Sequence, residues 1–292
     1  MEQVLIFAAL AVLGLVLGSF AGATVWRLRA RQLIEDKDEG EEVNKQEYKK
    51  LLPLTKSSLA NDRSRCLHCG HELAWYDLVP LASWLVTGGK CRYCHKKIGI
   101  FEPLIEIGSA IFFSGSYLLW PDSLVAPLAI TLFVLWLISG VLLAILFAYD
   151  LKWFLLPNRV VFPLIGVGVV IASLRLIGAE ELLLELISLG LAVTILSGLY
   201  LALWWVSKGK WIGFGDVKLG LALALLLGDW QLAFLALFLS NFIGCAIVLP
   251  GLLSGKMTRT THVPFGPLLI VGFVVSALFG HFILQWYFTI LS

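Results

Sequence analysis

Long apolar runs separated by short polar segments dominate this chain of 292 residues. A bilayer core of about 30 Å requires roughly 20 residues of helix, and only helices or closed barrels satisfy every backbone group there. The runs therefore predict about eight transmembrane helices. They cover residues 3–26, 103–120, 124–149, 160–177, 182–206, 217–228, 231–253 and 268–290. The expected fold is an all-α polytopic membrane protein, whose short sixth span is tilted or begins at the bilayer surface.

The composition excludes a soluble globule, because 59% of the residues are hydrophobic, only 14% are charged and the mean hydropathy is +0.88. Soluble domains carry about 25% charged residues. A net charge of +2 gives no support for nucleic-acid binding. Fourteen of the 22 Lys and Arg residues lie in one polar block between residues 27 and 97. We therefore expect three parts, namely a first transmembrane helix, a cytoplasmic loop and a seven-helix membrane domain, at residues 1–26, 27–102 and 103–292.

Within the loop, residues 32–62 are polar and mixed in charge, and we expect a solvated helical hairpin or a mobile loop there. The basic residues also predict the orientation of the chain. With the N-terminus outside, 21 of the 22 Lys and Arg residues lie in inner segments or at their boundaries, as the positive-inside rule requires. The exception, Arg175, is expected to reach the outer headgroups. Ala21-Gly22-Ala23 resembles a signal-peptide cleavage site, but basic residues follow this span instead of preceding it, so we expect an anchor.

Four of the five cysteines form two CxxC pairs separated by 21 residues, Cys66/Cys69 and Cys91/Cys94. Each pair can direct two thiolates to one ion about 2.3 Å away, and two pairs complete a tetrahedral zinc site. The expected cytoplasmic location disfavours disulfides, and a redox dithiol is the weaker alternative. A closed four-thiolate site has no open position for substrate, so we expect a structural zinc in a small zinc-ribbon-like insertion. Three nearby histidines could replace a thiolate but are better interpreted as surface residues: His68, His71 and His95.

Two aspartates at the ends of predicted spans are the candidate catalytic residues. Asp150 closes the third span, and Asp216 opens the sixth after Gly213 and Gly215. The predicted topology places both at the cytoplasmic boundary. Paired carboxylates permit peptide hydrolysis, because one takes a proton from water while its protonated partner polarises the scissile carbonyl. The two glycines leave room for an extended substrate backbone. Taken singly, Asp216 could be a helix N-cap and Asp150 a boundary residue.

In their order, these motifs resemble those of the type IV prepilin peptidases, membrane aspartyl proteases named for a GxGD motif. The similarity covers most of the chain. It rests on Gly18-Ser19-Phe20 with Arg27-Leu28, SRCLHCGHELAWYDLVPLASWL with KCRYC and Pro103-Leu104-Ile105-Glu106, Asp150 with Leu156-Pro157-Asn158 and Pro163, GFGDVKLG around Asp216, and His262-Val263-Pro264-Phe265-Gly266-Pro267.

The resemblance implies removal of the short basic leader from prepilins, or from pseudopilins of type II secretion, at the cytoplasmic face of the bacterial inner membrane. It implies Asp150 and Asp216 as the catalytic pair. Active-site or substrate-binding loops would then contain Gly213, Gly215, Pro264 and Gly266.

Many members of that family also methylate the new N-terminal amine, using S-adenosylmethionine. The retained zinc segment favours this second activity, and Glu106 is a candidate for its amine site. Three positions depart from the pattern, because Gly22, Arg29 and Val161 stand where many relatives have Asn, Pro and Thr.

Three other functions are compatible with parts of the sequence. A relative of presenilin and signal peptide peptidase also uses a GxGD aspartate, but the zinc segment and the HVPFGP motif count against it. An ion or proton transporter would hold carboxylates near the bilayer midplane, whereas these two are predicted at one boundary. A non-enzymatic zinc-ribbon scaffold would tolerate changes at Asp150 or Asp216. The expected partners are prepilins or pseudopilins and the lipid bilayer, with no nucleic acid.

Overall fold

The computed structural model describes residues 1–55, 63–121, 123–255 and 263–291, and the chain forms two compact units, Met1–Leu118 and Leu119–Ser292. The described residues form helices, turns and isolated bridges, without a β-strand. Within these ranges six helices are long and apolar enough to cross a bilayer. They are Glu2–Asp38, Pro127–Trp153, Asn158–Ile177, Leu182–Ser207, Trp230–Leu253 and Phe265–Ile290. The prediction of an all-α, multi-pass membrane protein is confirmed.

The predicted count of eight spans is approximate. The two further predicted spans, 103–120 and 217–228, are helical, as α4 (Phe101–Leu119) and α9 (Phe214–Leu227). Glutamates and serines lower the hydropathy of α4. At a rise of 1.5 Å per residue, the 14 residues of α9 extend about 21 Å, less than the roughly 30 Å of a bilayer core.

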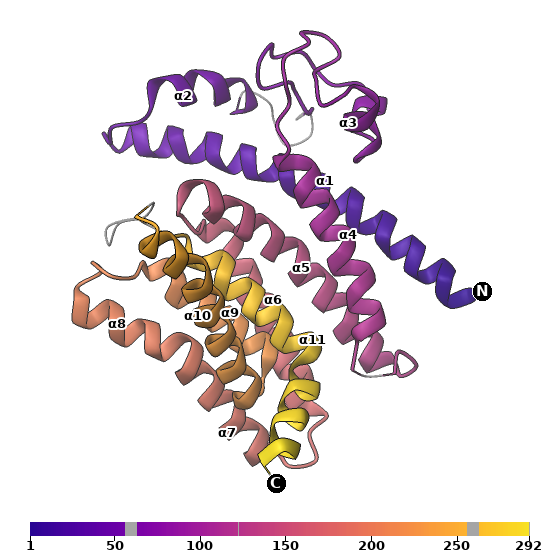
Figure 1. Ribbon diagram of the computed structural model, residues 1–292, viewed down its shortest axis with the longest axis vertical. Coiled ribbons are helices and arrows are strands. Elements are labelled where there is room, and N and C mark those ends of the chain that lie inside the picture. The colour runs from indigo at the N-terminus through magenta and orange to yellow at the C-terminus, as the bar shows by residue number, and fades with distance from the viewer. Residues whose placement is uncertain (56–62, 122, 256–262, 292) are drawn as a thin grey trace. The chain divides into compact units, whose positions relative to one another are not determined.

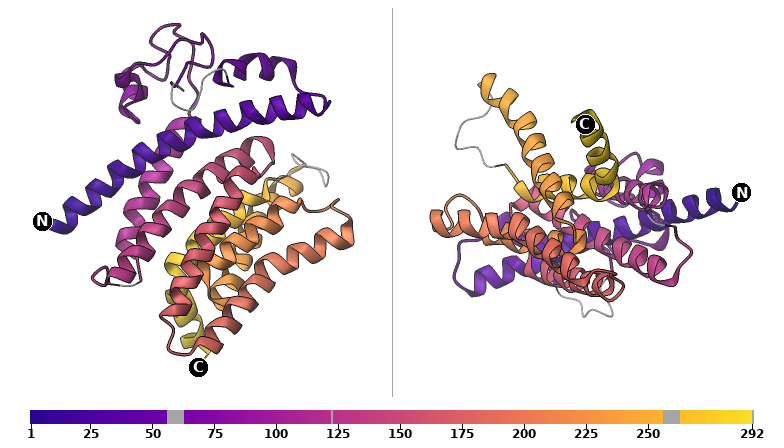
Figure 2. Two further views of the ribbon diagram at one scale, coloured as in Figure 1. Left: turned by 180° about the vertical axis from the view of Figure 1, so that it is seen from behind. Right: turned by 90° about the horizontal axis from the view of Figure 1, so that it is seen from below.

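The first unit is built on one long helix that carries short elements at its C-terminal half. α1 continues without a break past the predicted end of the first span, and α2 lies alongside it in both Figure 1 and Figure 2. Buried Ala30, Leu33 and Leu51 hold the two helices together. This agrees with the helical-hairpin alternative for this region, whose last seven predicted residues, 56–62, lie outside the described residues. The elements are α1 (Glu2–Asp38), α2 (Lys45–Leu51), η1 (Leu52–Thr55), η2 (Trp75–Leu78), α3 (Ala82–Val86) and α4 (Phe101–Leu119).

Two glycines on α1 allow close contact with α4. A Cβ atom on Gly14 would lie 2.7 Å from the Cα atom of Ala110, and one on Gly18 would lie 2.8 Å from that of Glu106. Three residues separate these glycines, the GxxxG spacing that lets helix backbones approach in membrane proteins. The Gly18-Ser19 motif thus has a packing role in this unit.

The second unit is a helical bundle in which α7, a π-helical turn and α8 form one continuous path (Figure 1). The π-helical turn is η3 (Thr194–Gly198). The helices are α5 (Pro127–Trp153), α6 (Asn158–Ile177), α7 (Leu182–Val193), α8 (Leu199–Ser207), α9 (Phe214–Leu227), α10 (Trp230–Leu253) and α11 (Phe265–Leu291).

The short helix α9 lies at the centre of this bundle and contacts α6, α7, η3, α8, α10 and α11. Its residues Leu219 and Leu223 are fully buried, and Gly220 packs directly on the carbonyl of Leu196 in η3. The guanidinium of Arg175 donates to the carbonyls of Leu226 and Leu227, at 2.9 and 2.5 Å. Arg175 thus contacts the C-terminal end of α9, where a cation is favoured, and its expected contact with the outer headgroups stays a prediction.

Candidate active site and metal centre

The two CxxC pairs converge on one point in the first unit. The four Sγ atoms of Cys66, Cys69, Cys91 and Cys94 all lie within 4.8 Å of one another, and those of Cys66 and Cys94 are 3.9 Å apart. A tetrahedron with metal–sulfur bonds of 2.3 Å has sulfur–sulfur edges of about 3.8 Å. The four cysteines could therefore hold one metal ion in a closed site.

Both pairs have the same local backbone conformation. In each pair, the amide of the first cysteine donates a hydrogen bond to the carbonyl of the residue five positions later. The carbonyl of that cysteine accepts a hydrogen bond from the amide of the residue four positions later, and all four distances are 2.9 Å. The fourth residue after the first cysteine is Gly70 in one pair and His95 in the other, with φ of 72° and 57°. Short-range turns thus aim both thiolates of each pair, which explains why sequence spacing alone indicated the site.

None of the three neighbouring histidines joins this cluster within the described part of the chain. The ring of His71 lies instead against that of Tyr93, with centroids 3.7 Å apart. Cys245 is an exposed residue of α10, remote in sequence from the cluster.

Asp77 connects η2 to the second cysteine pair. Its carboxylate accepts hydrogen bonds from Arg92 Nε and the Tyr93 hydroxyl, both at 2.9 Å, and from the Ala74 amide at 3.2 Å. Burial raises the pKa of Asp77, but the three hydrogen bonds outweigh burial and hold that pKa below its ordinary value of 3.8. The ionised carboxylate therefore stabilises the folded loop.

Asp150 lies in the last turn of α5 and is only 5% exposed. The helix ends beyond it because Phe154 adopts a left-handed conformation, with φ of 56°. The amide of Gly266, in the first turn of α11, donates to Asp150 Oδ2 at 3.1 Å. A Cβ atom on Gly266 would lie 2.7 Å from the same oxygen, so a larger residue would displace the carboxylate.

Asp216 lies in the first turn of α9, with Gly213 as the N-cap residue. The amide of Asp216 donates to the carbonyl of Gly213 at 3.1 Å. Asp216 is therefore not the N-cap of its helix, which excludes the simplest structural explanation for it. A Cβ atom on Gly213 would make an ordinary contact with Asp216 Oδ2, at 3.7 Å.

The turn that carries Asp216 and the α11 turn that binds Asp150 both contact Leu156. A Cβ atom on Gly215 would lie 3.2 Å from Leu156 Cβ, and one on Gly266 would lie 3.4 Å from Leu156 Cδ2. The charge of Asp216 also acts on the carboxylate of Asp150. The structure thus gathers the predicted residues Asp150, Asp216, Gly215 and Gly266 around one position.

The HVPFGP motif is described only in part. Pro264 precedes α11 directly, whereas His262 lies outside the described residues.

Lys218 fixes the start of α9 against the start of α6. Its Nζ donates to Asn158 Oδ1 and lies over the rings of Phe162 and Phe214, 5.6 and 5.4 Å from their centroids. This basic residue therefore joins two helix N-termini beside Asp216.

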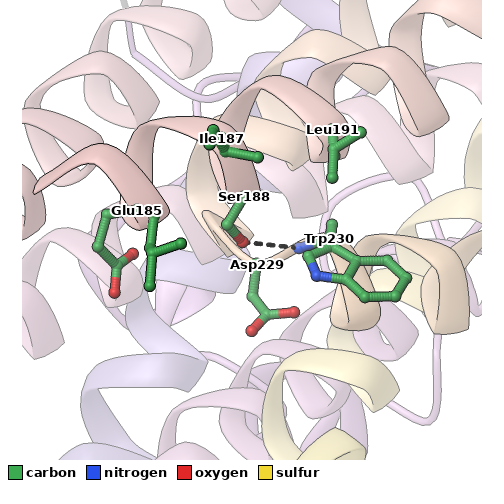
Figure 3. A pocket seen from close by; sticks show the side chains of 7 residues that line it. Glu185, Ile187, Ser188, Leu191, Asp229 and Trp230 are labelled. Atoms are coloured by element: carbon green, nitrogen blue, oxygen red, sulfur yellow. Dashed lines mark hydrogen bonds between the residues drawn. The ribbon is translucent and has the colours of Figure 1, made fainter. Parts of the chain in front are cut away.

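A cavity of about 300 Å³ lies at the opposite end of α9 (Figure 3). The Ser188 hydroxyl accepts a hydrogen bond from the Trp230 amide at 3.2 Å, and Asp229 borders the same space. Asp229 follows the C-terminus of α9, roughly 20 Å of helix away from Asp216. This cavity is therefore separate from the aspartate pair.

Glu106 is a buried carboxylate of the first unit, 6% exposed. It accepts a hydrogen bond from the Leu81 amide at 2.8 Å, and its backbone packs against Gly18 of α1. Leu81 has a positive φ of 59° and precedes α3. Glu106 thus links α1, α3 and α4.

Comparisons with known proteins agree with this architecture. Residues 12–120 match the Bacterial Peptidase A24 N-terminal domain, and residues 137–249 match the Type IV leader peptidase family. A prepilin leader peptidase/N-methyltransferase of Aeromonas hydrophila is 30% identical over 98% of this chain and 94% of its own length. The chain belongs to the type IV leader peptidase family.

Two further relatives are similar to this chain over comparable lengths. A prepilin leader peptidase/N-methyltransferase of Stutzerimonas stutzeri is 31% identical over 92% of this chain and 89% of its own. A type 4 prepilin-like proteins leader peptide-processing enzyme of Escherichia coli O78:H11 is 31% identical over 90% of both chains. No solved structure matches this chain.

The predicted family resemblance is confirmed, and neither the presenilin-like nor the transporter alternative is favoured. Sequence reasoning missed the hydrogen-bonding role of Asp77 and the packing role of Gly14. The four-residue spacing of Gly14 and Gly18 in an apolar span was a usable signal for the latter. For Asp77, no local pattern names Arg92 and Tyr93 as its partners.

Proposed function

We propose that this protein is a membrane aspartyl endopeptidase that removes the leader of type IV prepilins or type II secretion pseudopilins and methylates the new N-terminal residue. Family membership supports the reaction class. The observation that carries the site assignment is the convergence of Asp150 and Asp216, 66 positions apart in the chain, around Leu156.

In this proposal the two carboxylates share one proton, because adjacent negative charges in a buried site repel each other. The Gly266 amide and the N-terminus of α11 stabilise negative charge on Asp150. Asp150 is therefore the base that takes a proton from water, and protonated Asp216 polarises the scissile carbonyl. Gly213 and Pro264 border the two turns, where an extended substrate segment would lie.

The proposed location is the bacterial inner membrane, with the N-terminus outside and the cysteine cluster and aspartate pair on the cytoplasmic side. The excess of Lys and Arg in the predicted inner segments supports this orientation. A substrate helix in the bilayer would then present its basic leader to the cytoplasmic face.

The proposed metal is zinc with a structural role, held by Cys66, Cys69, Cys91 and Cys94. Four thiolates suit zinc and leave no open coordination position. S-adenosylmethionine is the proposed methyl donor, which supplies an electrophilic methyl group to the new amine. Glu106 would serve this reaction by holding the Leu81 turn beside α1 and α4.

Purified protein incubated with a prepilin in detergent tests the peptidase assignment. Asp150→Asn and Asp216→Asn should each abolish leader removal, because an amide neither takes the proton of water nor donates a carboxylic proton. Asp229→Asn is the matched control, since it lies at the other end of α9 and asparagine is also a good N-cap. Normal cleavage by both active-site variants would refute the assignment.

Methylation requires its own assay, with labelled S-adenosylmethionine and a pre-cleaved pilin. Wild type should transfer label, and Glu106→Gln should transfer less while cleaving prepilin normally. Absence of transfer by wild type would limit the protein to proteolysis.

A further inference from the structure

Tyr200 is a buried polar residue near the aspartates that the proposed mechanism does not use. It is 3% exposed and lies in α8, two residues beyond η3. Its hydroxyl has no hydrogen-bond partner among the described residues. Folded proteins rarely bury a hydroxyl without a partner, because doing so sacrifices its bonds to water. The hydroxyl therefore does not contribute to stability through a hydrogen bond within the described residues.

The ring of Tyr200 lies beside the turn that holds Asp150. Its centroid is 5.4 Å from that of Phe265 in an edge-to-face arrangement. Phe265 directly precedes Gly266, whose amide binds Asp150. The phenol also lies within electrostatic range of Asp216. Tyr200 thus lies beside the α11 turn that binds Asp150 and within range of Asp216 itself.

The π-helical turn η3 directly precedes α8, the helix that carries Tyr200. Within that turn the Ser197 hydroxyl donates to the carbonyl of Val217 at 3.0 Å, one residue beyond Asp216. Ser197 is three residues before Tyr200, so this bond ties the segment that carries Tyr200 to the start of α9. π-helical turns occur frequently at functional sites.

Resting on the proposed peptidase function, we infer that Tyr200 is a further catalytic residue whose hydroxyl donates a hydrogen bond to the carbonyl oxygen of the scissile peptide bond. The water oxygen bonds to the carbonyl carbon, and a water proton passes to Asp150. The proton of Asp216 passes to the carbonyl oxygen, which gives a neutral gem-diol. Tyr200 keeps its proton and stabilises the negative charge that builds on this oxygen.

Collapse of the gem-diol reverses both proton transfers. The carbon–nitrogen bond breaks, Asp150 returns its proton to the leaving amine, and Asp216 takes a proton from one gem-diol hydroxyl. The products are the leader carboxyl group and the new pilin amine, and Tyr200 is unchanged.

Tyr200→Phe in the full-length protein tests this inference, because it removes the hydroxyl and keeps the ring against Phe265. Loss of one donor to a developing oxyanion lowers kcat by about 100-fold or more, and KM for the prepilin should change little. The melting temperature should equal or exceed that of wild type, since the removed hydroxyl has no partner. Tyr287→Phe is the matched control, because Tyr287 is 53% exposed and lies 21 residues beyond Gly266 on α11.

Several results would overturn the inference. A normal kcat would exclude the hydrogen bond, and a lowered melting temperature or a variant that fails to fold would assign the hydroxyl a structural role. A shift of the acid limb of the pH–rate profile, with an unchanged plateau, would place the bond on an aspartate instead. If Tyr200→Phe is fully active while Asp150→Asn is inactive, the inference about Tyr200 is wrong and the peptidase proposal is supported. Absence of cleavage by wild type removes both proposals.

Discussion

The cysteine cluster and the aspartate pair are assembled by different kinds of interaction. Each cysteine pair lies within one short turn, and the same backbone hydrogen bonds recur in both turns. The aspartates come from the end of α5 and the start of α9, and they are brought together because both helices pack on α6 and α11. Local spacing therefore specifies the first site, whereas tertiary packing specifies the second.

Because they are assembled differently, the two sites depend on different features of the protein. Thiolates brought together by turns still repel one another, so a bound metal ion is expected to stabilise the cluster. The aspartate pair depends instead on glycines that let backbone reach a carboxylate, as Gly266 does at Asp150. Substitutions that remove metal ligands and substitutions that add one methyl group should thus affect different parts of the protein.

The largest effect is expected for the double variant Cys66→Ser/Cys69→Ser, which should lose the metal ion. Two remaining thiolates do not complete the site, so metal content should fall from one ion per chain to none, and proteases should cut the loop. Elemental analysis and limited proteolysis measure these outcomes. Cys245→Ser should leave both unchanged, and a normal metal content in the double variant would contradict the proposed cluster.

A smaller effect is expected for Gly266→Ala, which places a methyl carbon 2.7 Å from Asp150 Oδ2 and so forces the carboxylate to shift. Displacement of a catalytic group by about 1 Å can cost roughly 100-fold in rate. Gly213→Ala is the matched comparison, because its new methyl group would contact Asp216 at an ordinary distance of 3.7 Å. Equal prepilin cleavage rates for the two variants would show that the contact at Asp150 does not matter.

The smallest effect concerns Asp77 and pH. Because its pKa is lower in the folded state, ionised Asp77 stabilises the loop above the ordinary value of 3.8, and this stabilisation is lost as the pH falls through the folded value. Asp77→Asn should therefore lower the melting temperature of the loop at pH 7 and have less effect near pH 3. A difference from wild type that is independent of pH would contradict the role of the carboxylate.

Much of this architecture follows from sequence patterns. Apolar runs indicated the helices, and the CxxC spacing indicated the metal ligands, because both signals are local. The end of the first span was harder to predict, since α1 continues to Asp38 through a polar stretch whose apolar residues Ala30 and Leu33 pack on α2.

Long-range contacts could not be predicted in the same way. No local pattern shows that Arg175 bonds to the end of α9, or that Ser197 in a π-helical turn bonds beside Asp216. The family resemblance identified the two aspartates as the catalytic pair. How they come together is explained only by the packing of Gly215 and Gly266 on Leu156.

Cross-linking tests the convergence of the aspartates most directly. Asp150→Cys with Asp216→Cys, in a Cys245→Ser background with the metal bound, should be joined by a short thiol-specific reagent, so that proteolysis between the helices leaves the fragments connected. Asp150→Cys with Asp229→Cys should not be joined, because Asp229 lies beyond the far end of α9. Failure of the first pair to react, or equal reaction of both pairs, would contradict a shared active site.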